Sequence, residues 1–353
     1  MLLLHSMNEK KKKITFIVNP ISGTSKKDSV PDLVKEMLDA EIFEQPEILF
    51  TEYAGHAAVI ARQCVDSHVD VCVAVGGDGT VNEVARSLVH THTALGIIPC
   101  GSGNGLARHL CLPIDPKRAI SIINKCQIED FDYGLINNLP FFCTCGMGFD
   151  AFISLKFAEA GKRGPITYVE NVLKAGLKYK PETYVIDDEN GSQKYKAFLV
   201  ACANAAQYGN NAYIAPGASM KDGMMDVIIM EPFDALEAPQ IAADLFMKTL
   251  SNNSKIKTFR TRQLHIHRAT EGAIHYDGDP IMTGRDVDVS IEHLGLNIVT
   301  NPEATEDTAQ PNAVLNAFSD LFNNINNVRE DIEKRAGRIQ RINKVMLRKL
   351  TKL

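Results

Sequence analysis

The first 130 residues alternate short apolar runs with stretches whose apolar residues recur at helical spacing. The apolar runs occupy residues 14–18, 46–51, 71–75 and 94–99, and the helical stretches occupy residues 32–38, 57–64 and 80–85. Apolar runs bounded by turn residues predict buried parallel strands, and the helical stretches between them predict crossover connections. This part of the sequence therefore predicts a doubly wound α/β domain.

The pattern changes after residue 127. Strand-like segments now alternate with turns rich in Gly, Asp and Pro, at residues 184–186, 196–203, 225–230, 264–267 and 287–291. Helical stretches remain at residues 154–160, 169–178 and 235–250. We expect a second, mostly antiparallel β-sandwich domain. The expected organisation is an α/β domain over 8–130, a β-rich domain over 131–300 and a helical extension over 301–353.

The extension repeats apolar residues at alternating steps of three and four from Phe318 to Leu353, which is a heptad pattern. Residues 329–353 also hold nine Lys or Arg against three acidic residues. The heptads predict a helix that packs on its own domain or forms a homodimer through residues 315–353. The alternative is that the basic face binds an anionic membrane.

Composition adds mild limits. The chain has 353 residues, 45% of them hydrophobic and 23% charged, which is typical of a soluble globular protein with room for two cores. No apolar run is long enough to span a membrane, and the eight cysteines form no CxxC pair. We expect a cytoplasmic protein with reduced thiols, any membrane contact being peripheral, and no nucleic-acid partner.

The segment Gly76-Gly77-Asp78-Gly79-Thr80 follows the apolar run 71–75 directly and opens a helix. Glycines allow a phosphate to approach the backbone, and a helix N-terminus offers unpaired N–H groups to an anion. A carboxylate at Asp78 would repel phosphates unless a cation or a proton lies between them, so it predicts Mg²⁺ or acid–base chemistry. The alternative is a tight turn in which Asp78 caps the helix.

Two further turns with glycine follow predicted strands, at residues 19–23 and 100–105. Because the carboxyl ends of parallel strands lie along one edge of a sheet, we expect the three turns to form one ligand site. GxxxxGK[ST] is absent, which argues against a P-loop. Leu106 occupies the third glycine position of G-x-G-x-x-G, which argues against a Rossmann dinucleotide site.

An ordered series of motifs resembles the diacylglycerol kinase and sphingosine kinase family of lipid kinases, in particular the catalytic domain of soluble bacterial diacylglycerol kinases. The motifs are VNPISG at 18–23, FTEYAGHA at 50–57, GGDGTVNEV at 76–84, IIPCGSGNGLAR at 97–108, GMGFDA at 146–151, the segment 204–227 and HYDGDP at 275–280. The resemblance implies an amino-terminal nucleotide-binding domain like those of NAD kinases and phosphofructokinases, and a β-rich domain that binds the lipid.

The resemblance also implies ATP and Mg²⁺ as cofactors. The residues expected to bind ATP are Asn19, Ser22, Gly23, Thr51, Gly76, Gly77, Asp78, Gly79, Thr80, Asn82, Glu83, Gly101 and Ser102. These loops hold few basic residues, so Mg²⁺ would have to neutralise much of the charge of ATP. Asp78 is expected to act in catalysis and to face this metal.

In the β-rich domain, Asp277 matches the general base of the family, and its alternative is an ordinary Asp-Gly hairpin turn. Asp279 stands where many relatives have Glu. Asp150 matches the position that contacts the polar head of the substrate in sphingosine kinases, and its alternative is a helix cap. Met224 and Asp226 match a second, structural Mg²⁺ site, although Lys221 stands where an acidic ligand would be expected.

The resemblance therefore implies an ATP-dependent lipid kinase that transfers the γ-phosphate to a primary hydroxyl of diacylglycerol or a sphingoid base at a membrane surface. One alternative is an NAD kinase-like enzyme acting on a small molecule, since such enzymes share the GGDGT turn. The other is a non-catalytic module that binds a nucleotide or a lipid. The presence of both Asp78 and Asp277 favours catalysis over plain binding.

Overall fold

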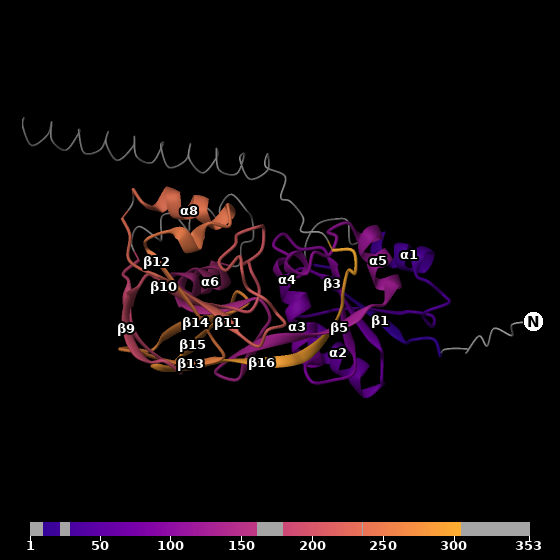
Figure 1. Cartoon of the computed structure of the whole chain (residues 1–353). Helices are drawn as coiled ribbons and strands as arrows, with labels where there is room; N and C mark the ends of the chain where they lie inside the picture. Colours follow the sequence, from indigo (N-terminus) through magenta and orange to yellow (C-terminus); the bar gives the residue numbers. More distant parts are fainter. Residues whose placement is uncertain (1–9, 22–28, 161–178, 235, 305–353) are drawn as a thin grey trace, which may run out of the picture. The chain divides into compact units, whose positions relative to one another are not determined.

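A computed structural model of the chain describes residues 10–21, 29–160, 179–234 and 236–304 (Figure 1). These residues lie within one compact unit that ends at Asp307. The expected helix over 169–178, Ser22, Gly23 and the heptad segment 315–353 lie outside the described residues. Within the described part of the chain, no helix has both the length and the apolar character needed to cross a membrane.

The amino-terminal lobe is built on four parallel strands in the order β2-β1-β3-β4. They are β1 (Ile14–Val18), β2 (Glu47–Phe50), β3 (Val71–Gly76) and β4 (Ala94–Pro99). Every residue of β1, β3 and β4 is buried, which explains why their sequences are unbroken apolar runs.

Helices cover both faces of these strands (Figure 1). They are α1 (Val30–Met37), α2 (His56–Asp66), α3 (Asp78–Leu88), α4 (Gly105–His109) and α5 (Pro116–Lys125). On one face, Val34 of α1 and Ile120 of α5 pack in the same apolar core as Phe16. On the other face, α2 and α3 share a core with Ile17. The predicted doubly wound α/β architecture is confirmed.

The carboxyl-terminal lobe is a sandwich of two mostly antiparallel sheets. One sheet follows the order β12-β11-β10-β7-β14-β15, and the other continues the amino-terminal sheet as β16-β13-β8-β9, with β5 paired to β16 and β6 paired to β5. The strands are β5 (Ile128–Ile136), β6 (Leu139–Phe141), β7 (Thr144–Gly148), β8 (Glu182–Asp188), β9 (Gly191–Ala197), β10 (Leu199–Ala203), β11 (Met225–Met230), β12 (Ile256–Thr261), β13 (Gln263–Arg268), β14 (Gly272–Tyr276), β15 (Asp279–Thr283) and β16 (Asp286–Val299).

Apolar residues from both sheets form the core of the sandwich. Met147 and Val227 come from one sheet, and Ile186 and Ile266 come from the other. The helices α6 (Phe149–Ala160) and α8 (Ala238–Phe246) and the short 3₁₀ helix η2 (Leu250–Asn252) complete the described part of this lobe. The predicted antiparallel β-sandwich is therefore confirmed.

Strand β16 belongs to both lobes. It pairs with β13 and β5 in the sandwich and runs parallel to β4 at the edge of the α/β lobe. Its pairing with β5 shifts register between Glu292 and Leu296, and the fully buried Asp132 holds this bulge by accepting hydrogen bonds from His293 Nδ1 at 2.7 Å and Leu294 N at 2.8 Å. One continuous strand thus connects the lobes.

Two details of the predicted strands are wrong. The segment 196–203 is two strands, β9 and β10, which lie in different sheets, and the chain bends between them where Phe198 N donates to Met230 O at 2.7 Å. The strand expected over 287–291 extends over Asp286–Val299, because the bulge interrupts the alternation of apolar and polar residues.

Candidate active site

Two glycine turns meet at the carboxyl ends of β3 and β4. Gly77 precedes α3, and a Cβ atom built on Gly101 would lie 2.6 Å from Gly77 Cα and 2.9 Å from Asn104 Oδ1. Only glycine fits a position where two backbones approach this closely. The GGDGT and GSGNG turns predicted from the sequence therefore form one continuous surface of backbone.

Asp78 joins these two turns through its carboxylate. Its Oδ2 accepts a hydrogen bond from Asn104 N at 2.9 Å, and its Oδ1 accepts one from Gly105 N at 2.6 Å. The Asn104 side chain closes the same turn, since its Oδ1 accepts from Gly101 N at 2.9 Å and its Nδ2 donates to Gly101 O at 2.8 Å. Asp78 thus organises the second turn in addition to standing at the start of α3.

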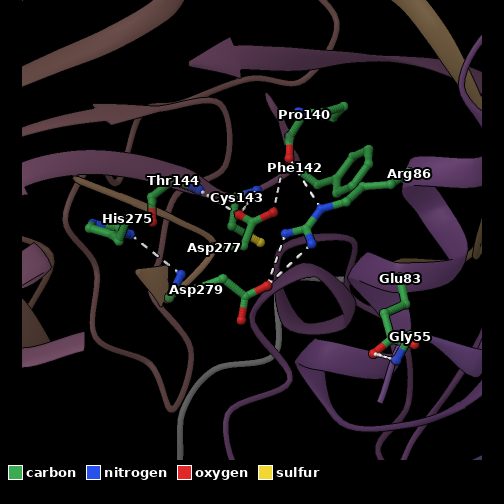
Figure 2. A network of polar contacts seen from close by, with 11 residues as sticks. Gly55, Glu83, Arg86, Pro140, Phe142, Cys143, Thr144, His275, Asp277 and Asp279 are labelled. Carbon is green, nitrogen blue, oxygen red and sulfur yellow. Dashed lines mark hydrogen bonds and ion pairs between the residues drawn. The ribbon is translucent and has the colours of Figure 1, made fainter. Parts of the chain in front are cut away.

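The other expected nucleotide residues line the same edge of the sheet. Asn19 Nδ2 donates to Thr80 Oγ1 at 3.0 Å, which joins the first turn to α3. Thr51 is buried at the end of β2, where its N–H donates to Val18 O at 2.9 Å. Glu83 Oε1 accepts from Gly55 N at 3.0 Å, as Figure 2 shows. The remaining residues of this set with described positions are Gly76, Gly77, Gly79, Asn82, Gly101 and Ser102, of which Gly79 and Ser102 are exposed.

We expect Gly101→Ala to lower kcat/KM for ATP about 100-fold, because the added methyl group would push the two phosphate turns apart. Initial rates with varied ATP would measure the loss. Gly217→Ala is the matched control, since a Cβ at this exposed glycine meets no atom within 4 Å. Equal rates for Gly101→Ala and the control would contradict the close approach of the turns.

Asp277 lies in a cradle of backbone amides. Its Oδ2 accepts from Phe142 N at 2.8 Å, and its Oδ1 accepts from Cys143 N at 2.7 Å and Thr144 N at 3.1 Å (Figure 2). Asp277 N also donates to Thr144 O at 2.8 Å. The half-buried carboxylate therefore has a fixed position at the start of β7.

Burial raises the pKa of the Asp277 carboxyl, although the three amide donors and the Arg86 guanidinium act in the opposite direction. A carboxylate whose pKa is raised accepts a proton more readily than an exposed one. Burial also raises the pKa of the Cys143 thiol, and the charges of Asp277 and Asp78 add to this effect. Both carboxylates are therefore near enough to Cys143 to act on the same thiol.

The Asp-Gly hairpin turn, which was the alternative explanation for Asp277, is present and carries the Asp277 carboxylate. Asp277 and Gly278 have φ values of 52° and 86° and connect β14 to β15, whose flanking residues Tyr276 and Asp279 pair directly. Two consecutive residues with positive φ are typical of a type I′ turn. The turn and the functional reading of Asp277 are therefore compatible.

Asp150 lies at the start of α6 and accepts three hydrogen bonds. Its Oδ1 accepts from Ala151 N at 2.8 Å, and its Oδ2 pairs with His275 Nε2 at 3.0 Å and accepts from Tyr208 OH at 3.3 Å. Gly278 N donates to His275 Nδ1 at 3.4 Å, so the neutral ring carries its proton on Nε2 and donates it to Asp150. This network connects the expected substrate residue to the Asp277 turn.

The acidic side chains around Met224 and Asp226 are paired with basic residues. Arg260 forms ion pairs with Asp222 and, at 3.6 Å, with Asp226 Oδ2, while Lys221 pairs with Glu129. Burial raises the pKa of Asp226, and its Oδ2 has no hydrogen-bond partner. In the described ranges, no three His, Cys, Asp or Glu side chains lie close enough to hold a metal ion. Arg260 already supplies positive charge beside Asp222 and Asp226, and a second Mg²⁺ at Met224 and Asp226 stays a prediction from the family resemblance.

The sequence did not single out Arg86, His275 or Asn104 as site residues. Arg86 lies on α3 eight positions after Asp78, and His275 lies two positions before Asp277. Proximity to a motif was the available signal for both. Asn104 falls inside the quoted GSGNG turn, but its role in closing that turn depends on a positive φ of 50° that the residue letters do not show.

Two family models match successive parts of the chain. Residues 13–136 match the diacylglycerol kinase catalytic domain, and residues 144–295 match the YegS C-terminal NAD kinase beta sandwich-like domain. An α/β lobe followed by a β-sandwich is the two-lobed arrangement that these two models describe in succession. The chain belongs to the diacylglycerol kinase family of lipid kinases.

Curated relatives agree with this assignment. An uncharacterized protein of Synechocystis, sll0036, is 30% identical over 67% of this chain and 58% of its own length. A diacylglycerol kinase of Staphylococcus saprophyticus is 26% identical over 76% of this chain and 89% of its own length. The chain spans less than two thirds of the length of the Synechocystis relative.

Solved structures share the fold. A diacylglycerol kinase from Bacillus anthracis superposes with a TM-score of 0.67 at 22% identity, covering 84% of this chain and 99% of that chain. An NAD kinase from Archaeoglobus fulgidus in complex with ATP superposes with a TM-score of 0.51 at 12% identity, covering 84% and 96%. The expected likeness of the fold to NAD kinases is confirmed.

Proposed function

We propose that this chain transfers the γ-phosphoryl group of ATP to the hydroxyl group of a diacylglycerol, with Asp277 as the general base. The observation that carries the proposal is the position of Asp277, whose carboxylate is fixed by three amides beside the lobe that bears the phosphate turns. A non-catalytic binding module would gain nothing from a half-buried carboxylate with a raised pKa. The named diacylglycerol kinases among the relatives support the same substrate class.

The nucleotide would lie on the two glycine turns. Backbone N–H groups at the start of α3 would hold the phosphates, and Asn19, Thr80 and the hydroxyl of Ser102 would complete their environment. Asp78 fits as a magnesium ligand, because a carboxylate accepts about four hydrogen bonds and only two are used by Asn104 and Gly105. Mg²⁺ would neutralise phosphate charge when bound.

Asp277 would accept the proton of the lipid hydroxyl while the hydroxyl oxygen forms a bond to the γ-phosphorus. At the same time, the bond between the γ-phosphorus and the β–γ bridging oxygen would break. The amides of Phe142, Cys143 and Thr144 would keep the carboxylate aimed at that hydroxyl. Water must be excluded for the lipid to be the acceptor, and Asp277 itself is half-buried, which limits its contact with water.

The hydrogen bonds that Asp150 already accepts leave about one acceptor position for the head group of the lipid. Ala151 N, His275 and Tyr208 already occupy its oxygens, which reduces what it can offer to the amine of a sphingoid base. A single hydroxyl needs only one acceptor position. A sphingoid base remains the second candidate substrate, because the GSGNG turn resembles that branch of the family. We also propose that the protein meets its lipid by peripheral contact with the membrane.

The test is a transfer assay with labelled ATP and Mg²⁺ on vesicles that contain diacylglycerol or sphingosine, and on NAD in solution. We expect phosphorylation of diacylglycerol at least 10-fold faster than of the other two acceptors. Faster phosphorylation of sphingosine would contradict diacylglycerol as the substrate and would leave the role of Asp277 as general base unchanged. Phosphorylation of NAD alone would contradict the proposal in favour of the NAD kinase-like alternative, which rests on fold likeness.

A further inference from the structure

Arg86 connects α3 of the nucleotide lobe to the hairpin that bears Asp277. Its Nη1 and Nη2 atoms each donate to Asp279 Oδ2 at 3.2 Å, and its Nε donates to Pro140 O at 3.3 Å. Figure 2 shows the guanidinium reaching both partners. The Arg86 side chain is 21% exposed and that of Asp279 is 51% exposed, so the ion pair by itself adds little stability and its effect is to fix position.

The guanidinium also stacks on Tyr276, with its central carbon 4.5 Å from the ring centroid. Tyr276 directly precedes Asp277, and Asp279 follows it by two residues. One side chain from the other lobe therefore holds both ends of the β14–β15 turn. Only arginine combines a planar fork with a face that stacks on an aromatic ring.

The third partner, Pro140, lies just before the amides that hold the base. Phe142, Cys143 and Thr144 supply the three N–H groups to the Asp277 carboxylate. Arg86 thus contacts β6, which leads directly into the segment of the donors, as well as the turn that provides the acceptor. The cradle of Asp277 is fastened on both sides by the same guanidinium.

The helix that carries Arg86 starts in the phosphate turn. Asp78 is the first residue of α3 and Arg86 lies eight residues further, about 12 Å along the axis at 1.5 Å per residue. A helix is rigid over this length. A fixed contact at Arg86 therefore sets the separation between the GGDGT turn and the Asp277 cradle.

We propose that Arg86 is a positioning residue of the kinase reaction, which fixes Asp277 relative to the phosphates through Asp279, Tyr276 and Pro140. The inference rests on the proposed function. A displacement of about 1 Å between reacting groups can lower a rate 100-fold. Arg86 acts through these partners and does not itself exchange a proton with the substrate.

The charge of Arg86 has a second, separable effect. The charged or titratable groups that face Asp277 are Arg86 from α3, Cys143 before β7, His275 on β14 and Asp279 on β15. Arg86 lowers the pKa of Asp277. Its removal should therefore move the acidic limb of the kcat profile to higher pH, whereas a lysine would keep the charge and lose the fork.

The test compares Arg86→Met and Arg86→Lys with wild type, and uses the exposed Arg62→Met as the matched control. We expect Arg86→Met to lower kcat 10- to 100-fold, to leave KM for ATP within about 2-fold, and to move the acidic limb to higher pH. Arg86→Lys should recover part of kcat and keep the limb at its wild-type pH. The proposal would be overturned if Arg86→Met had the kcat of the wild type and an acidic limb of the kcat profile at the wild-type pH.

Hydrogen exchange gives a readout that needs no lipid. If Arg86 fixes the cradle, the amides of Phe142, Cys143 and Thr144 exchange at least 10-fold faster in Arg86→Met, while amides of β1 exchange as in wild type. Uniformly faster exchange throughout the protein would overturn the proposal by showing a purely structural role. Absence of lipid phosphorylation in wild type would count against the proposed function alone, and these amides would still decide the role of Arg86.

Discussion

Replacing Asp277 by Asn is expected to lower kcat about 1,000-fold and to leave ATP binding nearly unchanged. General base catalysis contributes roughly 10²- to 10⁴-fold, and the amide of Asn has no basic oxygen for the hydroxyl proton. The three amide donors to Asp277 belong to the β-sandwich lobe, whereas the backbone N–H groups that would hold ATP belong to the other lobe. Initial rates of lipid phosphorylation and equilibrium titration with ATP would measure the two effects.

The matched control is Asp130→Asn, which removes an exposed carboxylate on β5 outside the site. In Asp277→Asn, the side-chain NH₂ group can only donate and would face a backbone N–H. Thermal unfolding of both variants would show whether the Asp277 cradle tolerates this change. Turnover of Asp277→Asn within 10-fold of the control would remove Asp277 from the role of base.

Among the substitutions considered, Arg268→Met should lower the free energy of unfolding most. Arg268 is 2% exposed, and its guanidinium donates to the carbonyl groups of Gly272, Ala273, Thr283 and Gly284 and to the Thr283 hydroxyl. Methionine fills much of the volume, but it removes six hydrogen bonds that the buried guanidinium donates to these partly exposed acceptors. We expect the free energy of unfolding to fall by about 3 kcal/mol.

Thermal or urea unfolding would measure this loss, with a fall in Tm of roughly 5–10 °C. The control is Arg262→Met, an exposed arginine between β12 and β13. The two variants test whether burial of the guanidinium matters, because both remove one positive charge from neighbouring positions of the chain. Equal midpoints for both would contradict a structural role for Arg268.

The sequence predicted what local pattern determines. Strands β1, β3 and β4 are buried on both faces, so their residues are uniformly apolar and their bounds could be placed closely. Strand β16 could not be delimited in the same way, because a bulge changes which face each residue occupies. A local alternation fails wherever pairing depends on a distant strand.

The site shows the same division. Glycine turns and an Asp-Gly dipeptide can be recognised in the sequence, since few other residues fit positive φ or close backbone contact. The contact of Arg86 with Asp279 joins positions 193 residues apart, and that of Asp78 with Gly105 depends on how two turns fold against each other. Such contacts are products of tertiary packing and had no local signal.

The course of β16 has a consequence for the order in which the protein can fold during synthesis. Strand β4 has β3 on one side and β16 on the other, and β16 is the last strand of the described chain. The match to the catalytic-domain family model ends at residue 136, well before β16. During synthesis, β4 therefore has an unpaired edge until the ribosome has released residues 286–299. An exposed edge of this kind favours pairing with other chains. The amino-terminal lobe expressed alone should therefore aggregate where the full chain stays monodisperse.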